Sequence, residues 1–230
     1  MSQHLEQSPS HTGVIDDMVR AVKPRLRGWL HAGTFPVSVA AGIVLVALAH
    51  GVRETIATAV YAVSAALLFG ISALYHSGNW TPKTEKLLKR LDHSNIFLII
   101  AGTYTPFSVI LLANRGGDTL LWIVWLAALG GIAFRVLWVG APRWLYTPVY
   151  LALGWVAVFY IADLWRTGGA AVVVLIAVGG LLYSVGGVVY ALKRPNPSPR
   201  WFGFHEVFHA LTLGAYAVHY VAISLATYQT

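Results

Sequence analysis

Long apolar runs separated by short polar joints dominate the pattern of this chain. A helix that crosses the hydrocarbon core of a bilayer needs about 20 mostly apolar residues. Seven runs reach this length, and they cover residues 29–49, 55–75, 91–112, 120–139, 144–164, 170–192 and 202–227. The joints between them carry glycine, proline or charged residues, which interrupt helices or remain in water. The pattern therefore predicts an all-α membrane protein, a bundle of seven transmembrane helices.

A polar tail of 28 residues precedes the first apolar run. Its apolar residues recur at the spacing of one helix face; they are Val14, Ile15, Met18, Val19 and Val22. A short helix on the membrane surface is one interpretation, and a tail without fixed structure is the other. We therefore expect a cytoplasmic N-terminal tail, residues 1–28, followed by a seven-transmembrane domain, residues 29–230.

Lysine and arginine are distributed unequally over the joints. The side that holds the N-terminal tail and every second joint carries 13 of them, whereas the other side carries 3, at Arg53, Arg115 and Arg166. Loops rich in Lys and Arg remain in the cytoplasm. The N-terminus is therefore expected in the cytoplasm and the C-terminus outside.

Composition supports a membrane protein and restricts its partners. Only 11% of the residues are charged and 57% are hydrophobic, whereas a soluble domain usually carries about 25% charge. The net charge of +7 comes from basic residues that lie in separate joints and form no continuous stripe. This distribution favours anionic lipid headgroups and excludes nucleic acid as the partner. The chain has no cysteine, so disulfides and thiolate metal sites are excluded.

Ionisable side chains inside the apolar runs are costly and therefore indicate function. His76 ends the second run, with Ser72 four residues earlier on the same helix face. Asp92 begins the third run, and His205 and His209 begin the seventh, again four residues apart. In the predicted topology all five residues lie at the cytoplasmic ends of their helices, so we expect them to form one site.

This set of residue types is suited to zinc. A catalytic zinc ion takes three protein ligands and keeps one position open, and neutral imidazoles suit zinc when no sulfur is present. His76, His205 and His209 are therefore the predicted Zn²⁺ ligands. Asp92 would hydrogen-bond a bound water or a ligand imidazole, and Ser72 would do the same or contact substrate.

Other polar residues have simpler interpretations. His31, His50 and His93 are interpreted as histidines of the wet membrane interface, and His219 as a buried hydrogen-bonding residue too far from His209 to share its metal. Ser72 could also bond a carbonyl of its own helix.

Two further patterns carry expectations. Residues 205–209 match the zinc-peptidase pattern HExxH, in which Glu206 is either a weak candidate for a base or the partner of a nearby arginine. Pro106 removes the hydrogen bond to the Gly102 carbonyl, so a bend is expected there, beside a polar pocket lined by Thr103 and Tyr104.

Four segments resemble the haemolysin III proteins, bacterial members of the progestin and adipoQ receptor family. They are Ser72-Ala73-Leu74-Tyr75-His76, Leu91-Asp92-His93-Ser94, Ala101-Gly102-Thr103-Tyr104-Thr105-Pro106-Phe107 and His205-Glu206-Val207-Phe208-His209. The resemblance implies seven helices in the bacterial plasma membrane, a cytoplasmic N-terminus, and a zinc site at the three histidines with Asp92 and Ser72 beside it. It also implies kinship with alkaline ceramidases.

Three functions stay open. The first is a zinc-dependent hydrolase of a membrane lipid amide or ester with a role in membrane homeostasis, in which Asp92 is the general base and Ser72 orients the tetrahedral intermediate. The second is a non-catalytic lipid sensor or receptor with structural zinc. The third is a haemolysin-like pore, although no segment resembles one that switches from soluble to inserted. In the first two, membrane lipids are the expected partners, as substrate or ligand.

Overall fold

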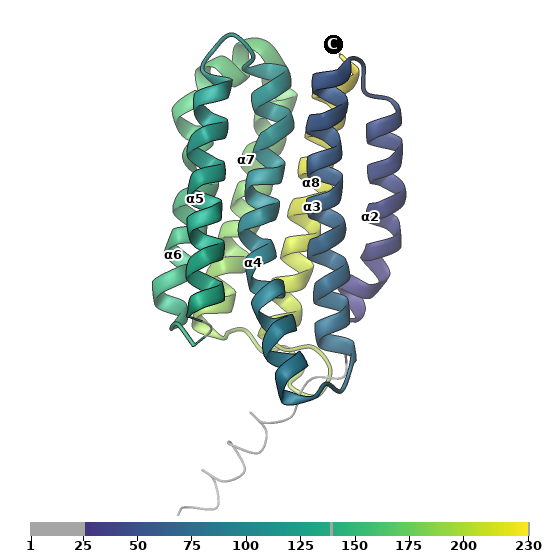
Figure 1. The fold of residues 1–230 in the computed structure, drawn as a ribbon, viewed down its shortest axis with the longest axis vertical. Helices are drawn as coiled ribbons and strands as arrows, with labels where there is room; N and C mark the ends of the chain where they lie inside the picture. Colours follow the sequence, from purple (N-terminus) through teal and green to yellow (C-terminus); the bar gives the residue numbers. More distant parts are fainter. Residues whose placement is uncertain (1–25, 139, 230) are drawn as a thin grey trace, which may run out of the picture.

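The computed structural model describes residues 26–138 and 140–229, and every regular element within these ranges is a helix. The α-helices are α2 (Trp29–Ala47), α3 (Val52–Ser77), α4 (Pro82–Pro106), α5 (Gly117–Leu137), α6 (Arg143–Gly154), α7 (Ile161–Leu192) and α8 (Phe204–Tyr228). A π-helix, η1 (Phe107–Leu111), continues α4, and a 3-10 helix, η2 (Val156–Tyr160), joins α6 to α7. The helices stand side by side as an upright bundle (Figure 1).

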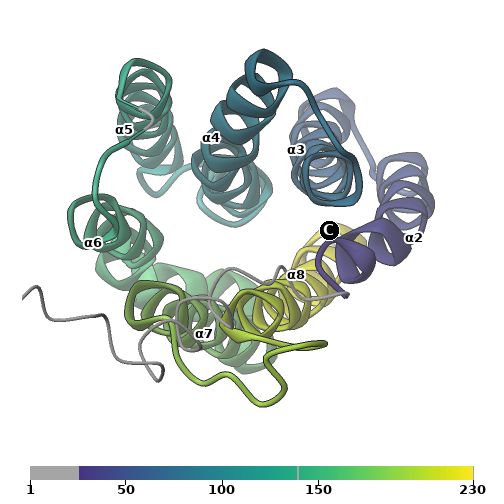
Figure 2. The same ribbon diagram turned by 90° about the horizontal axis from the view of Figure 1, so that it is seen from below.

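Viewed from below, the helices follow one another around the bundle in chain order (Figure 2). α8 returns beside α2, so the first and last described helices pack together. The C-terminal end of α3 and the N-terminal end of α8 thereby meet at one end of the bundle. We call this the basic end; it is formed by residues 26–28, 77–82, 140–143 and 193–204, and it carries the polar cavity described below.

Six helical stretches in the described ranges are long and apolar enough to cross a membrane, and one of them is the 50-residue stretch from Arg143 to Leu192. Gly169 interrupts that stretch with φ 74° and ψ 177°, a conformation that glycine adopts without steric penalty. The break lies in the joint predicted between residues 164 and 170.

The stretch folds back on itself at this break. Arg143 Nη1, at its start, donates to the Tyr190 carbonyl near its end at 3.1 Å. Trp155 Nε1, nearer the middle, donates to Ser184 Oγ at 2.9 Å. The segment around α6 and the second half of α7 therefore run antiparallel.

The bundle has an apolar exterior. Val52, Leu137 and Phe159 are 76%, 83% and 87% exposed, and many other large apolar side chains of the helices are exposed with them. Soluble monomers rarely expose apolar surface on this scale. Polar side chains such as Ser38, Thr58 and Ser64 are instead buried between the helices. This distribution suits a protein surrounded by lipid.

Two glycines allow the close approaches that position the site. A Cβ at Gly102 would collide with the Ser64 hydroxyl, so this glycine lets α4 pack against α3. Gly28 has φ +89°, and a Cβ there would lie 2.9 Å from the Cβ of His76.

The α-helical geometry of α4 ends at Pro106, and the π-helix η1 begins at Phe107. The sequence predicts a bend at this point. The helix predicted within the N-terminal tail lies outside the described residues.

Candidate metal centre

Three histidines from two helices converge at the basic end. His76 lies in the last turn of α3, and His205 and His209 occupy the first two turns of α8. One ligand nitrogen from each of the three lies within 4.8 Å of the others, and the group is buried. His76 Nε2 and His205 Nε2 are 3.1 Å apart. The structure thus brings together the three predicted ligands.

This spacing suits a metal ion. Zinc–nitrogen bonds of about 2.0–2.1 Å in tetrahedral geometry place two ligand nitrogens about 3.3 Å apart. The 3.1 Å between the two Nε2 atoms is close to that separation. In the absence of a metal the same contact is a hydrogen bond only if one ring carries its proton on Nε2. The three histidines could therefore hold a metal ion.

Asp92 and Ser72 lie beside this group, as the sequence predicts. Asp92 Oδ2, on α4, is 4.0 Å from His76 Nε2. The Ser72 side chain, one turn before His76 on α3, is 1% exposed and lies next to the Asp92 carboxylate on α4. The two side chains are thus neighbours beside the histidines.

Glu206, the acidic residue of the HExxH pattern, is used structurally. Its Oε1 accepts a hydrogen bond from Arg27 Nε at 3.1 Å, and its Oε2 accepts one from the Gly203 backbone N–H at 2.8 Å. The carboxylate caps the first turn of α8 and neutralises Arg27. Of the two interpretations of Glu206, the structure shows the one in which Glu206 pairs with an arginine.

His31 belongs to the site, and its assignment to a wet interface was wrong. Its ring is 2% exposed and lies parallel to that of His209. Neither ring nitrogen has a hydrogen-bond partner among the described residues. α2 carries this residue into the bundle because α2 packs against both α3 and α8. The sequence carried one signal of this role: His31 lies at the predicted cytoplasmic end of its apolar run, as the three predicted ligands do.

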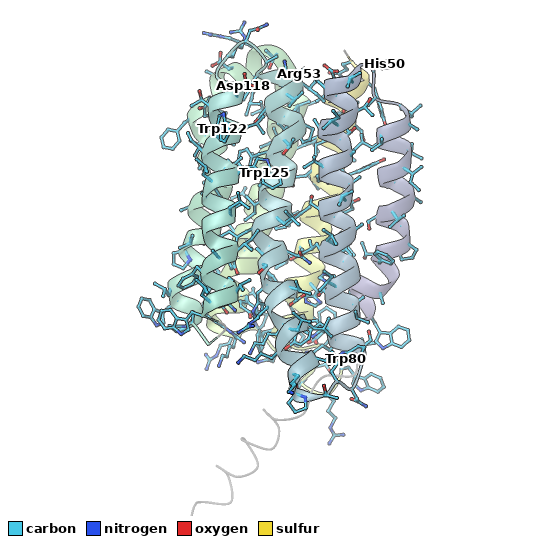
Figure 3. All side chains as sticks on the ribbon, in the orientation of Figure 1. His50, Arg53, Trp80, Asp118, Trp122 and Trp125 are labelled. Atoms are coloured by element: carbon cyan, nitrogen blue, oxygen red, sulfur yellow. The ribbon has the colours of Figure 1, made fainter. Side chains whose placement is uncertain are left out.

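The remaining histidines differ in their surroundings. His93 is also buried rather than interfacial, and its Nδ1 contacts Arg135 Nη2. His50 is exposed at the end of the bundle opposite to Trp80 (Figure 3). His219 is buried with Nε2 3.2 Å from the Ile176 carbonyl, which confirms its predicted hydrogen-bonding role.

Two cavities adjoin at the histidine site. The first is mainly apolar and lies between α3, α4, α6, α7 and α8; Ser72, Asp92 and His209 line it, as do Thr103 and Tyr104. The second is polar, has a volume of about 840 Å³, and lies at the basic end with His76 in its wall. Their shared lining residues are His93, Tyr190 and His205. The site can therefore be reached from an apolar and from a polar side.

Known proteins are similar to this chain over most of its length. The haemolysin-III related family matches residues 19–220. Hemolysin-3 of Bacillus cereus is 37% identical over 81% of this chain and 84% of its own length. Hemolysin-3 homolog of Bacillus subtilis is 37% identical over 74% of this chain and 76% of its own length. Monocyte to macrophage differentiation factor of Homo sapiens is more distant, 24% identical over 85% of this chain and 80% of its own.

The bacterial relatives and the six apolar helical stretches identify a multi-pass protein of the cell membrane. The match over residues 19–220 and the 37% identity to the bacterial relatives together show to which family the chain belongs. The chain belongs to the haemolysin-III related family.

Proposed function

We propose that this protein is a zinc-dependent hydrolase that cleaves an amide or ester of a membrane lipid. One observation carries the proposal: a group of three histidines, with Ser72 and Asp92 beside it, adjoins a mainly apolar cavity that Ser72, Asp92, His205 and His209 line. A metal-ligand set, a carboxylate and room for an apolar substrate are the parts that such a reaction needs.

The apolar cavity, with a volume of about 120 Å³, would hold part of a lipid chain. Leu68, Ile96 and Ile100 are among its lining residues, and Ser72 and Asp92 line the same space. An acyl chain that passes from the bilayer core to these walls stays in apolar surroundings, so the cavity can hold it without a desolvation cost. An acyl chain in this cavity would bring a carbonyl at its end to the polar residues.

His76, His205 and His209 would hold the zinc ion, because their nitrogens are close enough to share one ion and no cysteine competes. Bound zinc supplies a Lewis acid and lowers the pKa of water towards neutrality. Glu206 takes no part in this step, since both of its oxygens are engaged by Arg27 and by the start of α8.

Asp92 is the residue that would move the proton. Its Oδ2 lies 4.0 Å from His76 Nε2, so a water molecule beside the ligand set is within reach of the carboxylate. The Ser72 hydroxyl, beside Asp92, would orient the carboxylate, and it lines the cavity in which the carbonyl would lie.

The proposal includes seven crossings with the N-terminus in the cytoplasm. The antiparallel return at Gly169 supports two crossings between Arg143 and Leu192, since 50 helical residues would measure about 75 Å and a bilayer core is about 30 Å thick. The split of 13 to 3 in Lys and Arg supports the orientation. The metal centre then lies near the cytoplasmic face.

A direct test uses purified protein in nanodiscs, supplied with labelled ceramides, phospholipids and acyl amides. Zinc-dependent release of fatty acid from one of these classes is expected. A protein that holds zinc and binds lipid but hydrolyses none of them would instead be a lipid sensor with structural zinc.

A further inference from the structure

Arg135, on α5, is a buried cation without a carboxylate partner. The side chain is 1% exposed, and no ion pair to it is formed within residues 26–138 and 140–229. Its Nε and Nη1 have no hydrogen-bond partner in the same ranges. An arginine stays charged in a protein, and burying that charge unpaired is strongly unfavourable. A bound anion would compensate this charge.

The contacts that Arg135 does make leave its charge uncompensated. Its Nη2 contacts His93 Nδ1, and its Cζ lies 4.3 Å from the centre of the Tyr146 ring. A cation–π contact of this kind offsets only part of the cost of burying an unpaired ion. The two contacts hold the guanidinium in place and leave two of its nitrogens available.

Arg135 lines the polar cavity at the basic end, and the other charges there are mostly positive. The basic side chains in its wall are Arg27, Lys89, Arg135, Arg143 and Lys193, and the acidic one is Glu85. Arg27 is already paired with Glu206. Arg143 is held over the Tyr190 ring at 4.3 Å and donates Nη1 to the Tyr190 carbonyl. The cavity therefore has an excess of positive charge that attracts anions.

We propose that this cavity is a binding site for a phosphate group, with Arg135 as its buried anchor and Arg143 and Lys89 at its walls. A guanidinium donates charged hydrogen bonds to phosphate oxygens, and the Nε and Nη1 of Arg135 have no partner among the described residues. The phosphate is either that of a lipid headgroup or free inorganic phosphate.

The position of this cavity favours the lipid headgroup. His93, Tyr190 and His205 line both the polar and the apolar cavity, so one ligand can occupy both. A lipid with its acyl chain in the apolar cavity and its phosphate at Arg135 would have its linking region beside His205. The substrate class is then a phosphate-bearing acyl lipid, an assignment that rests on the proposed hydrolase function, whereas the phosphate site rests on Arg135.

Binding of non-cleavable probes tests the site separately from catalysis. The probes are a dye-labelled dialkylglycerol phosphate and the matched dialkylglycerol, which lack any amide or ester, added to the full chain in neutral detergent. We expect the wild type to bind the phosphate probe at least tenfold more tightly. Arg135→Gln should lose about 10- to 100-fold, the usual effect of removing a charged hydrogen bond. Arg143→Gln, at a partly exposed position, should lose severalfold and serves if Arg135→Gln does not fold.

Arg53→Gln is the matched control. Arg53 is exposed, pairs with Asp118, and lies at the end of the bundle opposite to Trp80, which lines the polar cavity (Figure 3). This variant should bind the phosphate probe as the wild type does. Zinc content, measured on each sample, reports whether the histidine site is intact.

A test with inorganic phosphate distinguishes the two sources of the phosphate group, a lipid headgroup and the free ion. If it raises the melting temperature of the wild type but not of Arg135→Gln, and the two lipid probes bind equally, the phosphate site stands and the lipid headgroup is excluded. Equal binding of both probes together with no effect of phosphate would overturn the site. Absence of hydrolysis with intact, Arg135-dependent binding would remove the hydrolase and leave the phosphate site.

Discussion

The imidazole of His31 lies parallel to the imidazole of His209, with the ring centres 3.8 Å apart and the planes inclined by 11°. The Phe69 ring also contacts His31, with the ring centres 5.1 Å apart and the planes inclined by 82°. A predicted metal ligand is thus supported by a ring from α2 that the sequence does not connect with it. The stacking restricts the orientation of His209, which a metal ligand requires.

The first prediction concerns this support. His31→Phe keeps an aromatic face and removes two buried nitrogens that lack partners, so melting temperature and zinc content should match the wild type. His31→Ala leaves a void and should lower the free energy of unfolding by about 2–4 kcal/mol, with weaker zinc retention. Loss of zinc in His31→Phe as complete as in His209→Ala would show that the His31 nitrogens themselves serve the metal.

The metal ligands should be separable from the other histidines by metal analysis. Purified protein is expected to hold one zinc ion per chain. His76→Ala, His205→Ala or His209→Ala should each lower the content sharply, because two imidazoles remain where three are needed. His50→Ala, at an exposed position, is the control and should keep the full content. Full zinc in His209→Ala would refute the assignment.

Glu206 should matter for stability rather than for chemistry. Glu206→Gln removes the negative charge that neutralises Arg27, so the free energy of unfolding should fall by about 1–3 kcal/mol. Zinc content and lipid hydrolysis should stay within threefold of the wild type. If hydrolysis instead fell a hundredfold in a folded, zinc-loaded sample, Glu206 would replace Asp92 as the candidate base.

The seven-crossing topology predicts where the C-terminus lies. A reporter fused after Gln229 should be active only outside the cytoplasm, and one fused before Trp29 only inside. A second pair of fusions on either side of Gly169 would test the return of the chain at that residue. A cytoplasmic C-terminus would leave an even number of crossings and exclude this topology.

Hydrophobicity predicted the helices well and their ends less well. In α2 and α8 the helical residues are nearly the same as the apolar residues, so both helices begin within two residues of the predicted runs. α4 instead begins at Pro82, nine residues before the predicted start at 91. Thr81 caps it, with its Oγ1 accepting from the Thr84 N–H at 3.4 Å, and the polar first turns continue the helix beyond the apolar run. Capping residues carry this information, whereas hydropathy does not.

The candidate site was predictable only where the signal lay along one helix. The spacing of His205 and His209 places both on one face, and polarity within an apolar run marks His76 and Asp92. His31 and Arg135 were missed because their roles depend on the rotation and packing of α2 and α5 against other helices. Such contacts between residues far apart in the chain leave no local pattern.

The central claim is that Asp92 moves a proton beside a histidine-bound zinc ion, and the variant that tests it is Asp92→Asn. Asparagine keeps the size of the side chain but cannot accept the proton, so hydrolysis should fall by about 10²–10⁴-fold. Zinc should remain bound, since the three imidazoles are unchanged. Wild type and variant are compared for zinc content and lipid hydrolysis on the same samples. Full zinc with strongly reduced hydrolysis is the predicted result, and undiminished hydrolysis in Asp92→Asn would contradict the account.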